Sequence, residues 1–301
     1  MIDAVILTEP RYIKDSEKEY IHNVFYEDQL VINALTKKGY RAIRLSWDDP
    51  DFDWSQTKSI VFRSTWDYFH RFAEFFKWLE KVSKVTKLIN SKTLIYWNLD
   101  KHYLLDLNKK GVHIPKTFFV EKGETQSLSK ILSELNWDEV VLKPCISGGG
   151  RHTYRFKSKD AESFEAIYNE LIQNESLMIQ PLQKQVLTKG EVSIMMFNGI
   201  YSHAILKRAK PGDFRVQDDF GGTIHHYEPS DNEIEFAKHC IKACPELPTY
   251  ARVDYFWDNN NQLALAELEL IEPELWFREH ELASDLMAEA IINKLNIVET
   301  I

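Results

Sequence analysis

The chain opens with an apolar run, a stretch of apolar residues at helical spacing, and a second apolar run, which predicts a strand, a helix and a strand. Two more buried strands and an amphipathic helix follow before residue 92. This order predicts a small α/β domain with a parallel sheet. The predicted strands are 4–7, 41–45, 59–62 and 87–89, and the predicted helices are 21–35, capped by Gly39, and 72–82.

Residues 93–182 show a second arrangement, in which short strands alternate with helices around a glycine run. Gly111 ends the first predicted helix, and Pro115 lies near the start of the next strand, where proline is tolerated. We expect an α+β subdomain whose glycine loop joins two strands. Its predicted strands are 114–120, 140–142, 153–156 and 177–180, and its predicted helices are 99–107, a helix ending near 135, and 161–172.

Residues 183–301 are expected to form a second α+β subdomain, built mainly from hairpins. Asn198-Gly199 separates two alternating strands, which is a strong hairpin signal. A polar, glycine-containing stretch at 210–222 predicts a loop. The predicted hairpins pair 191–197 with 200–206 and 251–257 with 263–270, and the predicted helices are 233–241 and 279–295.

Composition narrows the class of protein. The 301 residues are 44% hydrophobic and carry a formal charge of −9, which disfavours nucleic acid as the principal partner. No apolar run is long enough to span a membrane, and the N-terminus lacks the pattern of a signal peptide. Three cysteines form no disulfide framework, in agreement with a cytoplasmic protein. The negative net charge does not exclude small, phosphate-bearing ligands.

The first chemical signal is a buried strand that ends in Lys143-Pro144 and leads into Ser147 and the glycines Gly148, Gly149 and Gly150. Backbone N–H groups of such a loop can bind phosphates where side chains would obstruct close approach, and the lysine adds a positive charge. The chain lacks the spacing of a P-loop or of a dinucleotide fingerprint. A tight surface turn is the alternative interpretation of the same glycines.

The second signal is acidic. Glu267 and Glu269 point to one face of a strand, and Asp254 on the partner strand can lie opposite them. Three carboxylates on one face repel one another unless a cation lies among them, and oxygen ligands suit magnesium bound to nucleotide phosphates. A solvated acidic face is the alternative, but the apolar neighbours Leu268 and Leu270 favour a buried strand.

With these motifs in this order, residues 95–275 resemble an ATP-grasp enzyme of the glutathione synthetase and D-alanine ligase type. The resemblance implies an ATP-grasp fold, in which two α+β subdomains clamp ATP beside an N-terminal substrate domain. It assigns Lys101 and Lys143 as nucleotide lysines, residues 147–150 as the lid, and Gln180, Pro181 and Leu182 as the adenine hinge.

The same resemblance places Glu191 at the ribose hydroxyls, and Lys207, with Arg208 beside it, near the γ-phosphate. Arg252 would stabilise the transferring phosphoryl group, and Asp254, Glu267 and Glu269 would bind Mg²⁺. The family has asparagine at the position of Glu269. The change to glutamate keeps an oxygen ligand for the metal and adds a negative charge, so Mn²⁺ is an alternative to Mg²⁺.

Candidate substrate residues follow the third strand of the N-terminal domain, where parallel sheets bind ligands. Arg63 could pair with a carboxylate and Asp67 with an ammonium group, while Trp66 and Tyr68 could form the walls. An N-cap with core aromatic residues is the equally weighted alternative. Arg215 in the 210–222 loop is a further candidate, with a solvated arginine as its alternative.

The implied reaction is an ATP-dependent ligation that forms a carbon–nitrogen bond and releases ADP. A carboxylate of a small amino-acid-like substrate would become an acyl phosphate, which an amine then attacks. Similarity to small ATP-grasp proteins of natural-product pathways, among them the cyclase of D-cycloserine biosynthesis, leaves intramolecular cyclisation open. A catalytically silent nucleotide-binding module is the third alternative.

Overall fold

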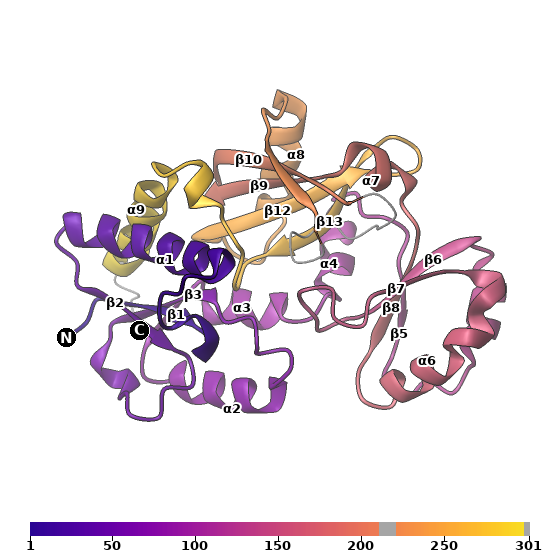
Figure 1. Cartoon of the computed structure of the whole chain (residues 1–301), viewed down its shortest axis with the longest axis horizontal. Coiled ribbons are helices and arrows are strands. Elements are labelled where there is room, and N and C mark those ends of the chain that lie inside the picture. Colours follow the sequence, from indigo (N-terminus) through magenta and orange to yellow (C-terminus); the bar gives the residue numbers. More distant parts are fainter. Residues whose placement is uncertain (211–220, 298–301) are drawn as a thin grey trace.

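The computed structural model describes residues 1–210 and 221–297. It contains a parallel sheet and two antiparallel sheets with helices packed around them, which confirms the predicted mixed α/β class (Figure 1). No helix within these ranges is long and apolar enough to cross a membrane.

The first sheet has the strand order β2-β1-β3-β4 and is parallel throughout, as the strand–helix–strand pattern predicts. Helices α1 and α2 follow β1 and β3, so the connections are those of a βαβ domain. Strands β1 and β3 are buried along their whole length, which explains their continuous apolar runs. The elements of this part are β1 (Ala4–Thr8), α1 (Glu19–Lys37), β2 (Ala42–Ser46), β3 (Ser59–Ser64), α2 (Phe72–Val82) and β4 (Lys87–Ile89).

The second sheet, of order β5-β8-β6-β7, forms the lobe at the right of Figure 1. It has a hydrophobic core of its own, built only from residues between Val120 and Ile179. The glycine run connects β6 to β7 and lies on the side of this lobe that faces the rest of the molecule. The elements are α3 (Lys92–Asn98), α4 (Tyr103–Lys109), β5 (Phe118–Val120), α5 (Leu128–Leu135), β6 (Glu139–Pro144), β7 (Tyr154–Lys157), α6 (Glu165–Ile172) and β8 (Leu177–Pro181).

The third sheet has the order β11-β10-β9-β12-β13 and is antiparallel. Asn198 and Gly199 both have positive φ, 49° and 75°, as the predicted β9–β10 turn requires. Apolar residues of this sheet, such as Met195 and Tyr250, share one core with Ala4 and Ile6 of β1, and α9 packs against α1. The elements are α7 (Lys184–Lys189), β9 (Glu191–Phe197), β10 (Ile200–Arg208), β11 (Thr223–His226), α8 (Asp231–Lys242), β12 (Tyr250–Trp257), β13 (Leu263–Glu269) and α9 (Ala283–Asn296).

Several predicted boundaries are wrong. The strand expected at 114–120 covers only Phe118–Val120, since Pro115 has no N–H for a ladder. The helix expected at 99–107 is α4, which begins only at Tyr103, and α3 before it was not predicted. The helix expected at 161–172 begins as a 3-10 helix, Ser158–Phe164. Helix α9 starts four residues later than expected, at Ala283. Helix α7 and strand β11 are too short and polar to produce a hydrophobic period, so the pattern missed them.

Candidate active site

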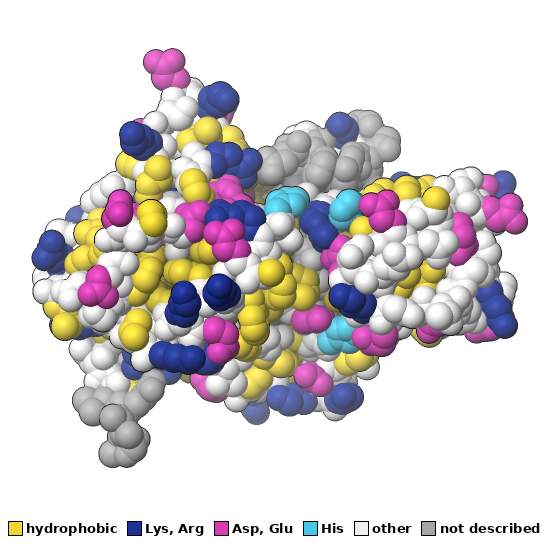
Figure 2. Space-filling model, turned by 90° about the horizontal axis from the view of Figure 1, so that it is seen from below, with side chains coloured by type: hydrophobic (Ala, Val, Ile, Leu, Met, Phe, Trp, Pro, Cys, Tyr) yellow, Lys and Arg dark blue, Asp and Glu magenta, His cyan; other side chains and the backbone are white. Residues whose placement is uncertain are grey.

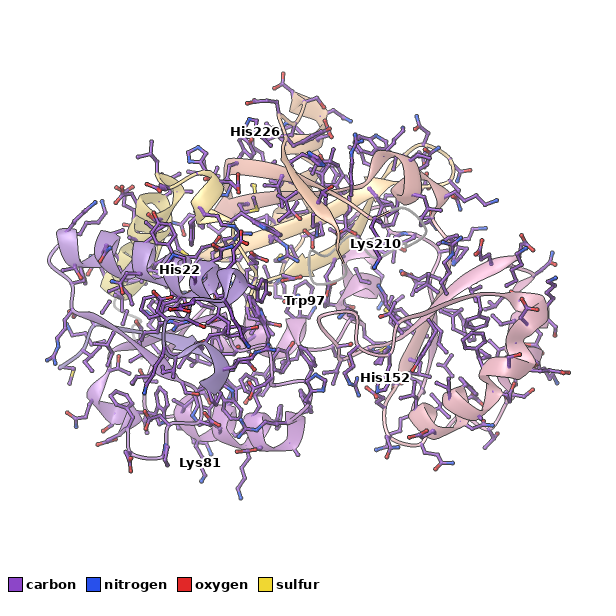
Figure 3. All side chains as sticks on the ribbon, in the orientation of Figure 1. His22, Lys81, Trp97, His152, Lys210 and His226 are labelled. Carbon is purple, nitrogen blue, oxygen red and sulfur yellow. The ribbon has the colours of Figure 1, made fainter. Side chains whose placement is uncertain are left out.

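A cavity of about 820 Å³ lies where the three sheets meet, lined by residues from all of them. The carboxyl ends of β1 and β3, the β6–β7 loop, α7 and the β12–β13 hairpin each contribute to its lining. Seen from below, the boundary between the right-hand lobe and the main body carries a concentration of basic and histidine side chains (Figure 2). His152, in the β6–β7 loop, lies on the side of that lobe nearest the main body (Figure 3) and lines the cavity.

Most residues that the sequence singled out line this one cavity, although they come from distant parts of the chain. Arg208 does not line it and is exposed to solvent, and Arg215 lies outside the described residues. The predicted residues that line the cavity are Trp66, Asp67, Tyr68, Lys101, Lys143, Ser147, Gly148, Gly149, Gly150, Gln180, Pro181, Leu182, Glu191, Lys207, Arg252, Asp254, Glu267 and Glu269.

The glycine loop closes one wall of the cavity. Lys101 donates from Nζ to the backbone oxygen of Ser147 at 2.5 Å, so the turn before α4 anchors the start of the loop. A Cβ atom at Gly148 would lie only 2.7 Å from the ring of Phe69, which belongs to the N-terminal domain. A side chain at Gly148 would therefore have to displace the Phe69 ring or the loop itself.

Lys143 extends from the end of β6 into the cavity and forms no ion pair with any residue that the structure describes. Burial, together with the neighbouring charge of Lys101, lowers the pKa of Lys143, while Glu267 opposes this effect. A half-buried ammonium group without a carboxylate partner is suited to an anionic ligand such as phosphate.

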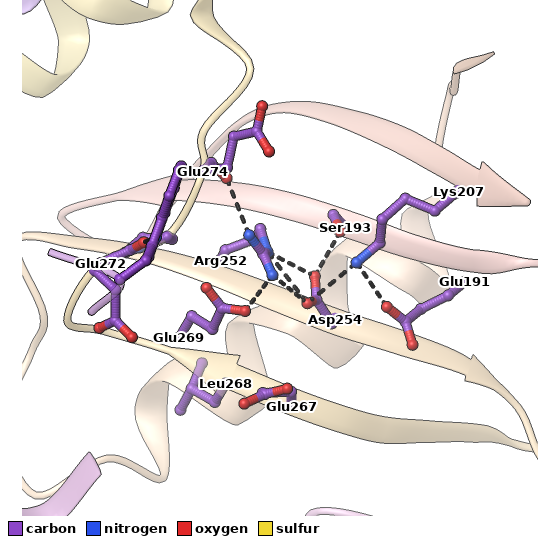
Figure 4. Close-up of polar contacts among 12 residues, drawn as sticks. Glu191, Ser193, Lys207, Arg252, Asp254, Glu267, Leu268, Glu269, Glu272 and Glu274 are labelled. Atoms are coloured by element: carbon purple, nitrogen blue, oxygen red, sulfur yellow. Dashed lines mark hydrogen bonds and ion pairs between the residues drawn. The ribbon is translucent and has the colours of Figure 1, made fainter. Parts of the chain in front are cut away.

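The acidic residues lie on the predicted face of the β12–β13 hairpin. The ladder pairs Asp254 with Glu267 and Arg252 with Glu269. Cationic side chains lie among these carboxylates: Arg252 contacts both Asp254, at 2.8 Å, and Glu269, and Lys207 lies 3.3 Å from Asp254 (Figure 4). The repulsion expected from sequence is thus compensated by the protein itself, which corrects the inference that only a bound cation could hold the carboxylates together.

The pKa values of Asp254 and Glu269 are shifted in opposite directions. Burial alone would raise the pKa of Asp254, but the charges of Arg252 and Lys207 outweigh burial and lower this pKa to about 2. For Glu269 burial dominates, and the charges of Glu267 and Asp254 add to it, so its pKa is raised well above the ordinary value despite Arg252. Asp254 is the firmly ionised member of the group.

The donor set fits Mg²⁺ chemically, because Asp254, Glu267 and Glu269 offer oxygen ligands on one face of the sheet. Their oxygen atoms do not all lie within 4.8 Å of one another. Over residues 1–210 and 221–297, the triad that meets this spacing is Asp100, His102 and Cys145. Burial raises the pKa of the Cys145 thiol, which disfavours the thiolate that a metal would need. The metal role of the carboxylates on β12 and β13 stays a prediction.

The opposite end of the cavity is more apolar. Val141, Leu182, Val186 and Phe256 line it beside the predicted hinge at 180–182. The Leu182 N–H donates to Glu139 across the sheet at 2.8 Å. These apolar side chains beside a strand end suit a flat aromatic base.

Glu191 lies between the apolar and the acidic ends of the cavity and is paired with Lys207 at 2.6 Å. Burial raises the pKa of this carboxyl, and Lys207 opposes the rise. Its predicted contact with ribose would add to this existing ion pair.

The N-terminal segment that follows β3 is only partly as expected. Trp66 and Tyr68 line the cavity, but Asp67 accepts hydrogen bonds from Trp47 at 2.7 Å and from Arg71 at 2.8 Å, so its carboxylate is already engaged. Arg63 is buried and does not reach the cavity.

The guanidinium of Arg63 is bound within the fold. It pairs with Glu27 and Asp28 of α1 and donates to the Pro273 backbone oxygen at 2.7 Å. The expectation that Arg63 binds a substrate carboxylate is therefore wrong in this structure. Its side chain lies on β3 behind the cavity, where it joins α1 to the segment after β13.

Several residues at the site were missed. Glu272 and Glu274 follow the acidic strand and line the cavity. Trp276 does not line it, but its ring centroid lies 5.1 Å from the Arg252 guanidinium and 5.8 Å from the Lys207 ammonium. The run of acidic residues from Glu267 onward was the available signal, but its last members fall beyond the predicted strand.

A phosphate-type glycine loop, cavity lysines and a carboxylate–arginine hairpin around one cavity define a nucleotide-dependent enzyme. Comparisons with known proteins agree. Residues 105–247 match the model of the prokaryotic glutathione synthetase ATP-grasp domain, and residues 5–90 match that of the N-terminal domain of the D-cycloserine synthetase DcsG. The cycloserine biosynthesis protein DcsG of Streptomyces lavendulae is 30% identical over 289 residues, covering 90% of this chain and 94% of the relative.

Solved structures extend the likeness. The crystal structure of D-cycloserine synthetase DcsG superposes with a TM-score of 0.83 at 27% identity, covering 97% of this chain and 99% of that one. The D-alanine–D-alanine ligase of Bacillus anthracis shares the fold, with a TM-score of 0.65 at 16% identity, covering 98% and 97% of the two chains. The chain belongs to the ATP-grasp family and is an ATP-dependent ligase related to DcsG.

Proposed function

We propose that this enzyme uses Mg·ATP to phosphorylate the carboxylate of a small amino-acid derivative, and that an amine of the same molecule then displaces the phosphate to close a ring. The observation that carries the proposal is the single cavity of about 820 Å³, which nucleotide-binding candidates share with residues 66–68 of the N-terminal domain. That volume suits a nucleotide together with one small second ligand. The DcsG relatives are named for D-cycloserine, itself a small cyclic amino-acid derivative.

Side chains of this protein have separate tasks in the two steps. Lys143 would bind the phosphates, while Arg252 and Lys207 would stabilise negative charge on the phosphoryl group during transfer. Asp254, Glu267 and Glu269 would hold Mg²⁺, which neutralises phosphate oxygens when bound. In the second step the amine nitrogen forms a bond to the carbonyl carbon, the carbon–oxygen bond to phosphate breaks, and the amine loses a proton.

The glycine loop and the N-terminal domain enclose these steps. Contact between Gly148 and Phe69 supports closure of the loop over the cavity, which would protect an acyl phosphate from water. Joining two separate molecules is the second candidate, favoured by the shared fold with D-alanine–D-alanine ligase. A silent nucleotide-binding module is disfavoured because the carboxylates Asp254, Glu267 and Glu269 and the cations Lys143, Lys207 and Arg252 all line one cavity.

The test measures ADP release with Mg·ATP and a panel of D- and L-serine, alanine, 2,3-diaminopropionate and their O- and N-carbamoyl derivatives. Product mass then separates the mechanisms. One substrate minus water or a leaving group indicates cyclisation, and two substrates joined indicate ligation. ADP release that no member of the panel stimulates would contradict an amino-acid-like substrate. D-Cycloserine serves as an added product-type inhibitor.

A further inference from the structure

The carboxylates that line the cavity differ in whether the protein provides a cation for them. All but one form an ion pair with a described lysine or arginine. Glu272 forms none with any residue in the described ranges, and Figure 4 draws no contact to its carboxylate from the residues shown there. The paired carboxylates are Glu9 with Arg11, Asp67 with Arg71, Glu191 with Lys207, Asp254 and Glu269 with Arg252, Glu267 with Lys101, and Glu274 with Arg278.

The N-terminal domain holds Glu272 in position. The indole N–H of Trp66 donates to the Glu272 backbone oxygen at 2.9 Å. Tyr68 faces the carboxylate: burial, followed by the charge of Glu272 and a hydrogen bond to it, raises the pKa of this phenol. Trp66 therefore holds the main chain at Glu272, and Tyr68 lies close enough to the Glu272 carboxylate to influence it.

Because no described lysine or arginine pairs with Glu272, burial of its carboxylate has an energetic cost. Burial raises the pKa of Glu272 to about 7, and the charge of Glu267 adds to the effect, while the hydrogen bond from Tyr68 and the charge of Lys101 oppose it. A half-buried charge without a partner is unfavourable unless a ligand supplies the opposite charge. Lys143 shows the opposite situation: it is a cation that lines the same cavity and forms no ion pair with a carboxylate of the described residues.

We infer that Glu272 binds the protonated amino group of the substrate, with Tyr68 and Trp66 as its positioning residues. The inference rests on the proposed function, because it assigns the binding site of an ammonium group of the same small molecule, one that is distinct from the unprotonated amine that attacks the acyl phosphate. Glu272 lines the same cavity as the acidic hairpin, Trp66 and Tyr68, so one small molecule bound there could contact both Glu272 and the phosphoryl group of ATP. Aromatic side chains beside the carboxylate favour an ammonium group further.

Asp67, the residue that sequence favoured for this role, is less suited to it. Its two oxygen atoms already accept hydrogen bonds from Trp47 and Arg71. A second magnesium ion is the competing occupant of Glu272. Mg²⁺ is usually bound by one or two carboxylates together with phosphate oxygens and water. The neighbouring Glu274 is paired with Arg278, so Glu272 would be the carboxylate ligand here, and the Mg²⁺ dependence measured below distinguishes the two occupants.

The test compares Glu272→Gln, which removes the charge and keeps the shape, with Glu235→Gln as a matched control on the exposed face of α8. With the most active compound of the panel, Glu272→Gln should raise the substrate KM about 10- to 100-fold, the loss typical of one charge-assisted hydrogen bond. KM for Mg·ATP should stay unchanged. Tyr68→Phe should raise the substrate KM less, and the control should not change it.

An unchanged substrate KM in Glu272→Gln would overturn the inference while leaving the ligase reaction intact. A shifted Mg²⁺ dependence with unchanged substrate KM would assign Glu272 to a second metal and overturn it as well. If Glu272→Gln does not fold, Glu272→Asp takes its place, because it keeps the charge but withdraws it from the cavity; its substrate KM should rise similarly, and an unchanged KM would again overturn the inference.

A second arm needs no substrate and so separates this inference from the proposed function. Thermal unfolding is measured in ethylammonium chloride and in tetramethylammonium chloride, which cannot donate a hydrogen bond. The parent protein should be stabilised more by ethylammonium than by tetramethylammonium, and Glu272→Gln should lose this difference. Equal responses of parent and variant would refute ammonium binding, even if the panel reveals an active substrate.

Discussion

Replacement of Gly148 by alanine tests whether the glycine loop closes against the N-terminal domain. The new Cβ would lie 2.7 Å from Cε1 and 3.2 Å from Cδ1 of Phe69, so the ring or the loop must move. Gly148 does not have a positive φ, so the substitution adds a steric contact without backbone strain. Overpacking of this kind costs about 1–3 kcal/mol. If the cost falls on the closed state, Mg·ATP affinity should fall about 5- to 150-fold.

Calorimetric titration with Mg·ATP measures this change without requiring the second substrate. The double variant Gly148→Ala with Phe69→Ala removes the ring that the new methyl group meets, so it should recover most of the lost affinity. Phe69→Ala alone provides the reference for the cycle. A double variant as weak as Gly148→Ala would refute the reasoning, because the loss would then come from the loop itself and not from its contact with Phe69.

Three further predictions concern single residues. Lys143→Ala should weaken ATP binding at least tenfold by calorimetry, because this ammonium lines the cavity and has no carboxylate partner among the described residues; a folded variant with unchanged affinity would remove it from the site. Glu269→Ala should lower Mg·ATP turnover about 10²- to 10³-fold, whereas Glu269→Asn, which keeps an oxygen ligand, should retain more; equal turnover of Glu269→Ala and parent would exclude Glu269 from the metal site. Burial lowers the pKa of His203 to about 4 in the folded protein, below the ordinary 6.5, so stability should be intact above pH 6.5 and decline by up to about 3 kcal/mol as pH falls toward 4. Acid unfolding of His203→Gln should lack that decline, and an unchanged acid profile would contradict it.

The sequence was informative where local chemistry decides structure. Hydrophobic periodicity located helix α2 at Phe72–Val82 and strand β4 at Lys87–Ile89, and Asn198-Gly199 located the β9–β10 turn. In each case the signal lies within a few residues, in a repeat of apolar side chains or in a turn that needs positive φ. The two-residue spacing of Glu267 and Glu269 likewise placed both on one face of β13, as the ladder confirms.

Tertiary structure decided which charged groups are available to a ligand. A sequence identifies Arg63 and Asp67 as polar residues after a strand, but it does not contain their partners, Glu27, Asp28 and Arg71, at the right distances. Ion pairs form between side chains that the fold brings together across the chain, and each pair removes a candidate from the binding site. Glu272 became a candidate for the opposite reason: the fold buries its carboxylate beside Tyr68 and leaves it without a cation among the described residues.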